Sequence, residues 1–413
     1  MKSILFSISL FLLIYGLPFA AAAQENNRPE KPNGQKAYTI EQACSDRAQL
    51  HTIAFDGLAW LTGSFGADCF FPPGKVADYF GFQYMRDNDK NSMGHNTDFL
   101  TRIANNVISL LNTDQLNQLV ALAKEQENLY TDFAQKRMVL IKAFRQSLEG
   151  TMPAGRKTLS RQAVINYCST LYGIDGELSF NRARVMGVII RSLTAEQKRA
   201  FDKLDFSNSG SWPVLEEKFD KRSLSHRAHV GLMTYASELF SWYKGSLTAD
   251  TYFCPERHGT YFGGFYLKDY PAMGNHGYSI STALTGDAGH SFLEVLDEGQ
   301  RKLVEEIPAL QKADLNAIVD TRKNIAVLLR KFMEGQSPDK TALLDLTRKY
   351  GELDGSLSYL YASRFGQINK TLTNSQKEQL KKLRNLDKWP AGTYLYSDPV
   401  SVPGEIDTGF LFE

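Results

Sequence analysis

The sequence predicts an all-α protein made of two tandem, duplicated helical-bundle domains, each with an irregular segment rich in glycine and aromatic residues. Three observations lead to this prediction. Apolar residues recur at spacings of three and four over most of the chain, as in amphipathic helices. The chain resembles itself when it is shifted by about 182 positions, which indicates a duplication. Residues that cap helices stand before corresponding helices in both copies.

The repeat is clearest in the two Gly/aromatic segments, residues 63–87 and 245–269. They share 11 identities over 25 aligned positions without a gap. Residues 115–150 align with 300–335 and keep several polar positions, and Asp175-Gly176 matches Asp354-Gly355. We therefore expect the two copies to have the same order of helices.

The expected helices follow from apolar spacing, capping residues and the positions of glycine and proline. The first copy is predicted to have helices over residues 40–61, 97–111, 114–130, 131–148, 160–171, 175–191 and 194–204, and the pattern is compatible with either two helices or one over 114–148. The second copy opens with a helix over 223–243 and repeats this order up to a last helix over 373–386. The predicted domains are 39–207 and 223–387, joined by a linker over 208–222 and followed by an irregular tail over 388–413.

The first 23 residues have the order of a secretory signal peptide. Lys2 precedes an apolar run over residues 4–17, and small residues end at Ala23. Residues 24–38 are polar and are expected to be a disordered leader. No later apolar stretch is long enough to predict a membrane span. We therefore expect a periplasmic or secreted protein.

The charge balance gives no sign of a nucleic-acid partner. The chain has 47 basic and 46 acidic side chains, for a net charge of +1, whereas nucleic-acid binding favours a basic excess.

Four helix starts carry a residue that can cap the helix, followed by Gln three positions later, as in a capping box. They are Asn112 or Thr113 with Gln115, Thr194 with Gln197, Asp297 with Gln300 and Thr373 with Gln376. Two such motifs about 80 residues apart, with basic helices between them, resemble the LTxxQ family of periplasmic proteins, which includes the Spy/CpxP-like chaperones and heavy-metal-associated relatives. The resemblance covers residues 111–204 and 296–386. Two of the four motifs lack the Thr of the family pattern.

The resemblance implies a non-enzymatic protein that binds unfolded or envelope proteins without ATP and takes part in the stress response. The expected client-binding surface is a basic and apolar helix face. It would carry Arg137, Arg145, Arg322 and Arg330.

The Gly/aromatic segments have two interpretations. Aromatic rings beside cations can bind sugars, peptides or flat cofactors, and the same rings can instead cover the helical core as a structural lid. The residues concerned are Tyr79, Phe80, Tyr84, Tyr261, Phe262 and Tyr266. One functional alternative is therefore a structural or surface component held by these segments.

Another functional alternative is a periplasmic zinc or copper sensor or buffer. Histidines gather in the second copy, and imidazole and thiol groups are ligands that both metals accept. The candidate ligands are His226, His229, Cys254 and His258. Their spacing matches no standard site and the first copy lacks them, so the simpler interpretation is surface histidines without a metal. Residues 87–98 resemble a calcium loop but lack its glycine and final glutamate.

Disulfides are permitted in an exported protein, and Cys44 with Cys69 is the first pair to consider. Cys168 lies in a helical pattern and is expected to be a buried free thiol. The sequence contains no GxSxG, HExxH, CxxC or phosphate-binding glycine motif. No enzyme activity and no resident cofactor are therefore predicted.

Overall fold

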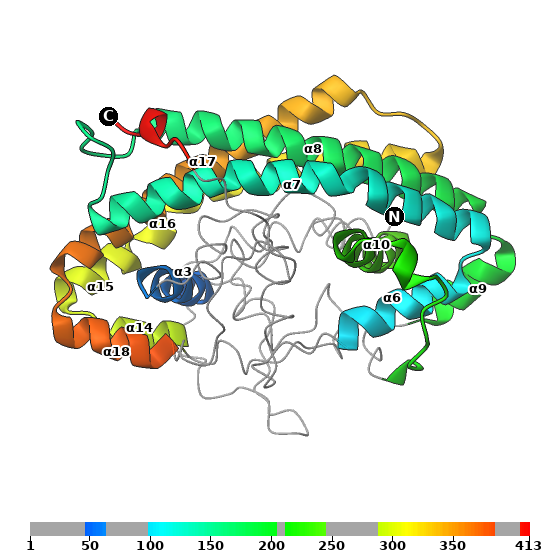
Figure 1. Cartoon of the computed structure of the whole chain (residues 1–413), viewed down its shortest axis with the longest axis horizontal. Helices are drawn as coiled ribbons and strands as arrows, with labels where there is room; N and C mark the ends of the chain where they lie inside the picture. Colours follow the sequence, from blue (N-terminus) through cyan, green and yellow to red (C-terminus); the bar gives the residue numbers. More distant parts are fainter. Residues whose placement is uncertain (1–45, 63–97, 205–210, 245–287, 385–404) are drawn as a thin grey trace.

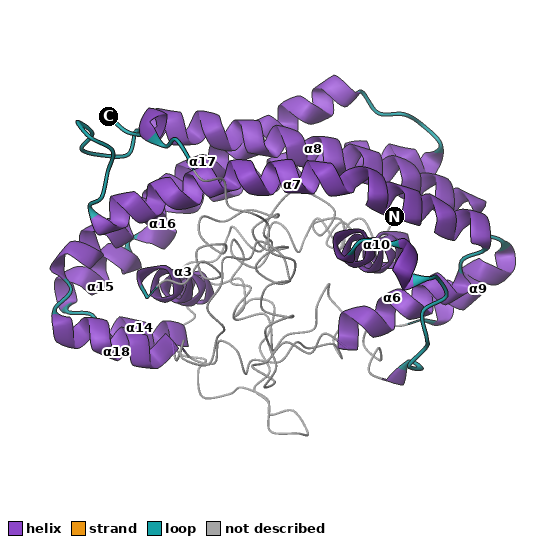
Figure 2. Ribbon diagram, in the orientation of Figure 1, coloured by secondary structure: helices purple, strands orange, loops and turns teal. Residues whose placement is uncertain are grey.

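The computed structural model describes residues 46–62, 98–204, 211–244, 288–384 and 405–413. Within these ranges the protein is all-α, as predicted, and Figure 2 shows helices joined by loops with no strand. The signal peptide, the leader and both Gly/aromatic segments lie outside the described residues. None of the described helices has both the length and the apolar content that crossing a membrane requires.

Four long helices pack on one another in a layer, which runs along the upper edge of Figure 1. They are α7 (Thr113–Glu149), α8 (Arg161–Ser192), α16 (Ile307–Arg330) and α17 (Lys340–Thr371). With 37 residues, α7 is about 55 Å long at 1.5 Å per residue. Shorter helices lie at both ends of this layer.

The cluster at one end contains α6 (Asp98–Leu110), α9 (Ala195–Lys203) and α10 (His226–Lys244). The cluster at the other end contains α3 (Asp46–Leu61), α14 (Ala288–Val295), α15 (Glu298–Glu305) and α18 (Asn374–Arg384). Three short 3-10 helices complete the described elements: η4 (Lys221–Ser223), η6 (Lys331–Glu334) and η8 (Gly409–Leu411).

The predicted helix break over residues 171–175 is wrong, because α8 continues through it. The sequence left open whether the helices meeting at residues 130–131 are one, and α7 is continuous there. The break after α7 is confirmed, since Gly150 ends the helix with a left-handed φ of 74°. The residues that align with α7 in the later part of the chain form two helices, α15 and α16. Pro308 at the start of α16 explains this division, because proline has no N–H to donate to the preceding turn.

Glycines let α8 and α17 approach more closely than side chains would allow. This contact is the most extensive between any two of the described helices. A Cβ atom on Gly351 would lie 2.6 Å from the carbonyl oxygen of Cys168, and one on Gly355 would lie 2.9 Å from Cα of Ile165. A Cβ atom on Gly176 of α8 would overlap Thr347 of α17. The crossing therefore needs glycine on both helices.

The two opening helices pack on opposite halves of the chain. We call residues 46–204 the first half and residues 211–384 the second half. Helix α3, from the first half, packs on α14, α15, α16, α17 and α18. Helix α10, from the second half, packs on α6, α7 and α8. Figure 1 shows α3 and α10 in the clusters at opposite ends of the long helices.

Aromatic contacts fix each exchanged helix. Trp60 of α3 meets Phe365 of α17 edge-on, with ring centroids 6.3 Å apart. Phe240 of α10 lies 6.0 Å from Phe201 of α9 and 5.5 Å from Trp212. The buried apolar residues of both halves belong to one cluster. Among the described residues, the predicted domains therefore share a core and do not form two separate bundles.

The predicted linker is attached to the first half over its described part. Asn106 of α6 donates to the carbonyl of Pro213 at 2.9 Å, and Asn105 donates to that of Leu215 at 3.2 Å. Lys218 donates to the carbonyl of Ser109 at 2.7 Å. These contacts bring the chain to the start of α10 while it runs along α6.

The predicted irregular tail has an ordered end. Residues 405–413, which we call the C-terminal strap, pack against the connection between α7 and α8. Leu159 and Phe412 form an antiparallel bridge, and Leu411 is fully buried. In Figure 1 this end of the chain lies beside the N-terminal end of α8.

The glycine crossing predicts a matched pair of substitutions. Gly355→Ala should destabilise the protein by about 1–3 kcal/mol, because the new methyl group meets the α8 backbone in a closely packed interface. Gly366→Ala on the same helix meets no atom within 4 Å. It should be neutral or stabilise by up to about 1 kcal/mol through helix propensity. Urea denaturation of the two variants measures both effects, and equal stabilities would contradict the proposed role of the crossing.

Candidate functional site

Each half contains a pair of glutamine side chains that joins two helix starts. In the first half, Gln197 donates through Nε2 to Oε1 of Gln115 at 2.7 Å and to the carbonyl of Leu110 at 2.8 Å. Nε2 of Gln115 donates to Oγ of Ser192 at 3.0 Å. In both glutamines Oε1 also accepts from the backbone N–H of the helix cap, Asn112 or Thr194. Each amide thus completes a capping box and connects it to the other motif.

The second half repeats this arrangement. Gln376 donates to Oε1 of Gln300 at 2.7 Å and to the carbonyl of Val295 at 3.0 Å. Gln300 donates to Oγ1 of Thr371 at 3.1 Å. All four predicted capping boxes are confirmed, with Asp297 and Thr373 as the caps in this half. The sequence predicted the caps but gave no sign that the glutamines would pair.

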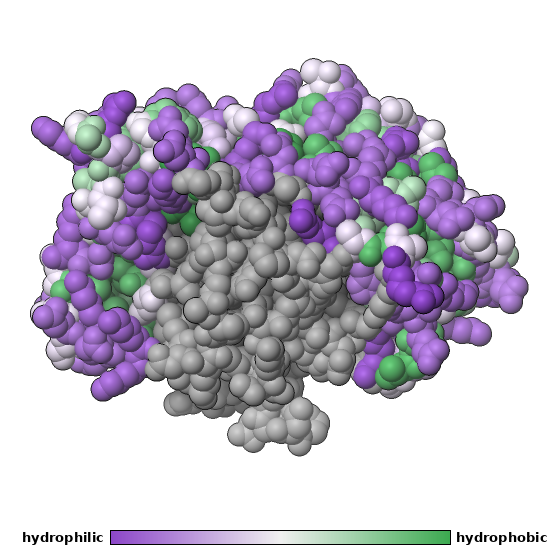
Figure 3. All heavy atoms as spheres, in the orientation of Figure 1, coloured by the Kyte–Doolittle hydropathy of each residue, from purple (hydrophilic) through white to green (hydrophobic). Residues whose placement is uncertain are grey.

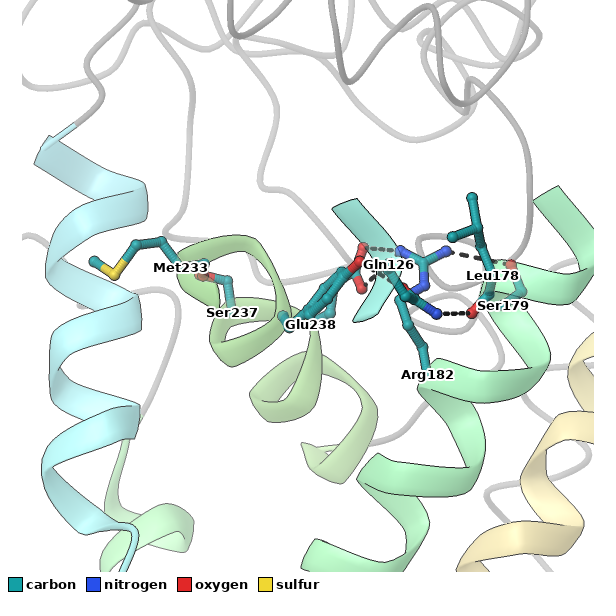
Figure 4. A network of polar contacts seen from close by, with 8 residues as sticks. Gln126, Leu178, Ser179, Arg182, Met233, Ser237 and Glu238 are labelled. Atoms are coloured by element: carbon teal, nitrogen blue, oxygen red, sulfur yellow. Dashed lines mark hydrogen bonds and ion pairs between the residues drawn. The ribbon is translucent and has the colours of Figure 1, made fainter. Parts of the chain in front are cut away.

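A buried polar network holds α10 against α7 and α8, and Figure 4 shows its side chains directed toward one another. Nη1 of Arg182 lies 3.1 Å from both carboxylate oxygens of Glu238, and Nη2 lies 3.2 Å from Oγ of Ser179. The side chain of Arg182 is 3% exposed and that of Glu238 is 11% exposed. The ion pair is thus screened from water, and each charge offsets the cost of burying the other.

The network continues through a tyrosine and a glutamine. Tyr235 of α10 donates to Oε1 of Gln126 at 2.6 Å, and Gln126 donates to the carbonyl of Leu178 at 3.0 Å. The guanidinium carbon of Arg182 lies 5.6 Å from the centre of the Tyr235 ring, within the range of a cation–π contact. Side chains of three helices therefore meet in one buried cluster.

The second half has a similar hydrogen bond between a glutamine and a tyrosine, but its tyrosine belongs to a different helix. Gln311 of α16 accepts at 2.5 Å from Tyr361, which belongs to α17 and not to the opening helix. In the alignment, Tyr361 stands where the first half has Arg182, and Asp56 of α3 stands where α10 has Glu238. Asp56 is fully buried. An acidic residue therefore lies in the same apolar region of both opening helices, and this sequence signal of buried polar groups was missed.

Two of the four predicted client-binding arginines are buried, so the prediction is wrong for them. Arg137 of α7 and Arg322 of α16 are each 3% exposed, so neither can meet a client from the folded structure. The helical period explains the error. Arg137 shares its face with buried Phe133, Leu140 and Phe144.

The other two predicted arginines are partly buried and make contacts within the protein. Arg145 donates to the carbonyl of Trp60 at 3.0 Å and lies 6.0 Å from the centre of its ring. Nη1 of Arg330 lies 3.7 Å from the sulfur of Met333. Arg145 thereby neutralises the carbonyl end of α3, where a cation is favourable.

A second polar cluster lies at the crossing of α8 and α17. Tyr172 donates to Oδ2 of Asp354 at 2.8 Å, and its ring lies 4.8 Å from that of Tyr350. Burial, and after it the charge of Asp354, raises the pKa of Tyr172 well above its usual value. Cys168, confirmed as a buried free thiol, has its pKa raised by burial and then by Asp354, while Arg137 lowers it. Both groups are held protonated, so Cys168 is not an activated nucleophile.

Only two of the four predicted metal ligands lie within the described residues. His226 and His229 lie in the first turn of α10, and Cys254 and His258 lie outside the described residues. Nε2 of His229 is 3.2 Å from Oε1 of Glu217, and its ring packs on Phe219. In the described part of the chain, no group of three or more His, Cys, Asp or Glu side chains is arranged to hold a metal ion. The zinc or copper site stays a prediction.

The six aromatic residues proposed as a ligand surface also lie outside the described residues, as do Cys44 and Cys69. Comparisons of the chain with protein-family models, with curated proteins and with solved structures found no match. The resemblance to the LTxxQ family therefore stays a prediction.

The ion pair in the network predicts strong coupling between its two members. Arg182→Met should destabilise the protein by about 3–5 kcal/mol, because it leaves the buried carboxylate of Glu238 without its counter-charge. The double variant Arg182→Met/Glu238→Met should lose less than either single variant, since no buried charge remains. Arg184→Met, at an exposed position two residues away, should change stability by less than about 0.5 kcal/mol. Additive losses in chemical denaturation would contradict the coupling.

The raised pKa values predict a loss of stability at alkaline pH. The unfolded chain releases the thiol proton near pH 8.5 and the phenol proton near pH 10, whereas the folded protein keeps both to higher pH. Unfolding therefore releases protons in this range, and the free energy of unfolding falls as pH rises. The decline should begin near pH 8.5 and become steeper above about pH 10. Denaturation of Tyr172→Phe should show lower stability at pH 7, by about 1–3 kcal/mol, and a shallower decline above pH 10. An unchanged slope would show that Tyr172 is not held neutral.

Proposed function

We propose that this protein is an exported, non-enzymatic binding protein that holds unfolded or envelope proteins without ATP. One observation carries the proposal: in each half, two capped helix starts are joined by a pair of glutamines, with two long helices between them. The two motifs of a half contact each other through their glutamines, which gives a structural reason for their places near both ends of a helical unit. The resemblance to the LTxxQ family rests on the same placement of motifs. Export rests on the sequence of residues 1–23 alone.

The polar side chains at the centre of the structure support a structural use of these groups. The Arg182–Glu238 pair, the Gln126–Tyr235 pair and the Tyr172–Asp354 pair each connect two helices. A holding function needs a stable helical frame and exposed surface of mixed character, and these pairs contribute to the first requirement. The exposed surface has to lie away from Arg137 and Arg322, because both side chains are buried.

The outer face of α8 provides a surface of the required type. Arg184 and Val188 follow at helical spacing, and Val188 is 39% exposed. Arg191 comes one turn further on, and its guanidinium donates to the carbonyl of Phe332. On α16, Val327 is 50% exposed. Figure 3 shows a mainly hydrophilic surface on which apolar groups are small and separated. Such a surface favours weak and reversible contact with non-native chains, since each contact buries little apolar area.

The proposal predicts that this face of α8 delays the aggregation of a denatured client. The wild-type protein at an equimolar ratio should slow the rise of light scattering by a chemically denatured model protein in the absence of ATP. Val188→Ser combined with Arg184→Ser should weaken this effect severalfold, because one apolar and one cationic contact are lost.

Val214→Ser provides the matched control, since Val214 is 82% exposed but lies outside the helices. It should leave the delay unchanged. If the wild-type protein gives no delay at all, the proposed function is wrong. If the α8 variant and the control behave alike, the surface assigned to α8 is wrong.

A further inference from the structure

The C-terminal strap occupies a defined site between α7 and α8. Its backbone pairs with the connection between these helices. The N–H groups of Lys157 and Thr158 donate to the main-chain oxygen of Glu413 at 2.8 and 3.2 Å, and Glu413 donates to the carbonyl of Thr158 at 2.9 Å. Ser160 donates to the carbonyl of Leu411 at 2.8 Å. The strap therefore adds to an exposed edge of backbone, as extended peptides do when a protein recognises them.

Three strap side chains are buried in this site, at a fixed spacing. Thr408 is 3% exposed, Leu411 is fully buried, and Phe412 is 3% exposed. Thr408 donates through Oγ1 to Oε1 of Gln146 on α7 at 2.6 Å. Phe410 is 49% exposed and leans on the ring of Tyr167, with centroids 5.5 Å apart. The site thus distinguishes positions 408, 411 and 412 from their neighbours.

Charge also matches across this contact. The strap carries Glu405, Asp407 and Glu413 and has no basic residue. The connection over residues 150–160 carries Arg156 and Lys157 and has no acidic residue. Nζ of Lys142 on α7 donates to the carbonyl of Ile406 at 2.9 Å. The site is therefore suited to an acidic segment.

We propose that this strap site recognises acidic peptides with the pattern Thr-x-x-Leu-Phe, and that the strap of a second copy of the chain is its partner. The site comprises Lys142, Gln146, the backbone of residues 157–160 and Tyr167. In the chain, 244 residues lie between Ser160 and Glu405, so the strap reaches this site as a separate segment. Release of the strap leaves the backbone donors and the Leu411 pocket open to an identical strap. This inference goes beyond the proposed function and uses a different surface from the outer face of α8.

A peptide with the sequence of residues 405–413 tests recognition on the full-length chain. Leu411→Asp in the chain should release its own strap, because a carboxylate cannot occupy the buried leucine position. Fluorescence anisotropy should then show the labelled peptide binding this variant at least tenfold more tightly than the wild-type chain, whose site is filled. Adding Gln146→Ala should weaken binding about tenfold, the equivalent of one hydrogen bond. A peptide with Leu411→Asp is the matched control and should not bind.

Proteolysis followed by mass spectrometry establishes that the strap of Leu411→Asp is released. If the strap is released and the peptide still does not bind, the proposal is overturned. A variant that keeps its strap in place is replaced by Leu411→Asp/Phe412→Asp, which removes both buried apolar side chains, and the same outcomes apply.

Exchange between copies is tested by complementation. The Leu411→Asp chain has an open site and a defective strap. A second chain with Gln146→Ala and Ser160→Pro has a defective site and an intact strap. Proline fits at position 160, where φ is −81°, and removes the N–H that donates to Leu411. Mixing the two chains should give a one-to-one complex in sedimentation equilibrium that neither chain forms alone. No complex at 100 µM would overturn the assignment of a second copy as the partner.

Discussion

The close approach of α8 and α17 is the constraint on which the rest of the structure depends. Each helix belongs to a different half of the chain, and their contact is the most extensive in the described part of the structure. Gly176, Gly351 and Gly355 allow it, because a methyl group at any of them would strike the opposite helix. The same approach places Tyr172 within hydrogen-bonding distance of Asp354. Packing and polar pairing therefore act at one place and select one alignment of the two helices.

The exchange of the opening helices follows from this central contact. At each end of the layer, the opening helix of one half packs against helices of the other half. The Arg182–Glu238 pair and the Tyr235–Gln126 hydrogen bond then fix α10 in position. Buried ion pairs add little net stability compared with apolar packing, but an unpaired charge is costly. We infer that these groups determine which opening helix packs at this end of the layer.

The sequence predicted the helices better than it predicted their partners. Helix class, the capping boxes at Asn112 and Thr194, and the buried thiol of Cys168 all depend on local patterns, and all are confirmed. The exchange of α3 and α10 could not be predicted, because apolar periodicity shows that a helix face is buried and not which helix covers it. The continuity of α8 was missed because Gly173 and Gly176 look like breaks in sequence, whereas Gly176 serves helix contact.

The candidate site shows the same limit. Arginines in a helical pattern were interpreted as a surface, although the spacing of Arg137 relative to Phe133 and Phe144 already placed it on the buried face. The pairing of Gln115 with Gln197 joins residues 82 positions apart, and no local rule predicts such a contact. The ordered strap was also missed, because its backbone pairs with a loop near Lys157 that is far away in sequence.

The two halves form one interlocked body, and calorimetry tests this arrangement most directly. Two halves that share a core and exchange helices should unfold together, so the calorimetric enthalpy should equal the van 't Hoff enthalpy in a single transition, at scan rates where unfolding is reversible. Two separate bundles should unfold independently. Two resolved transitions, or a calorimetric enthalpy about twice the van 't Hoff value, would contradict the interlocked arrangement.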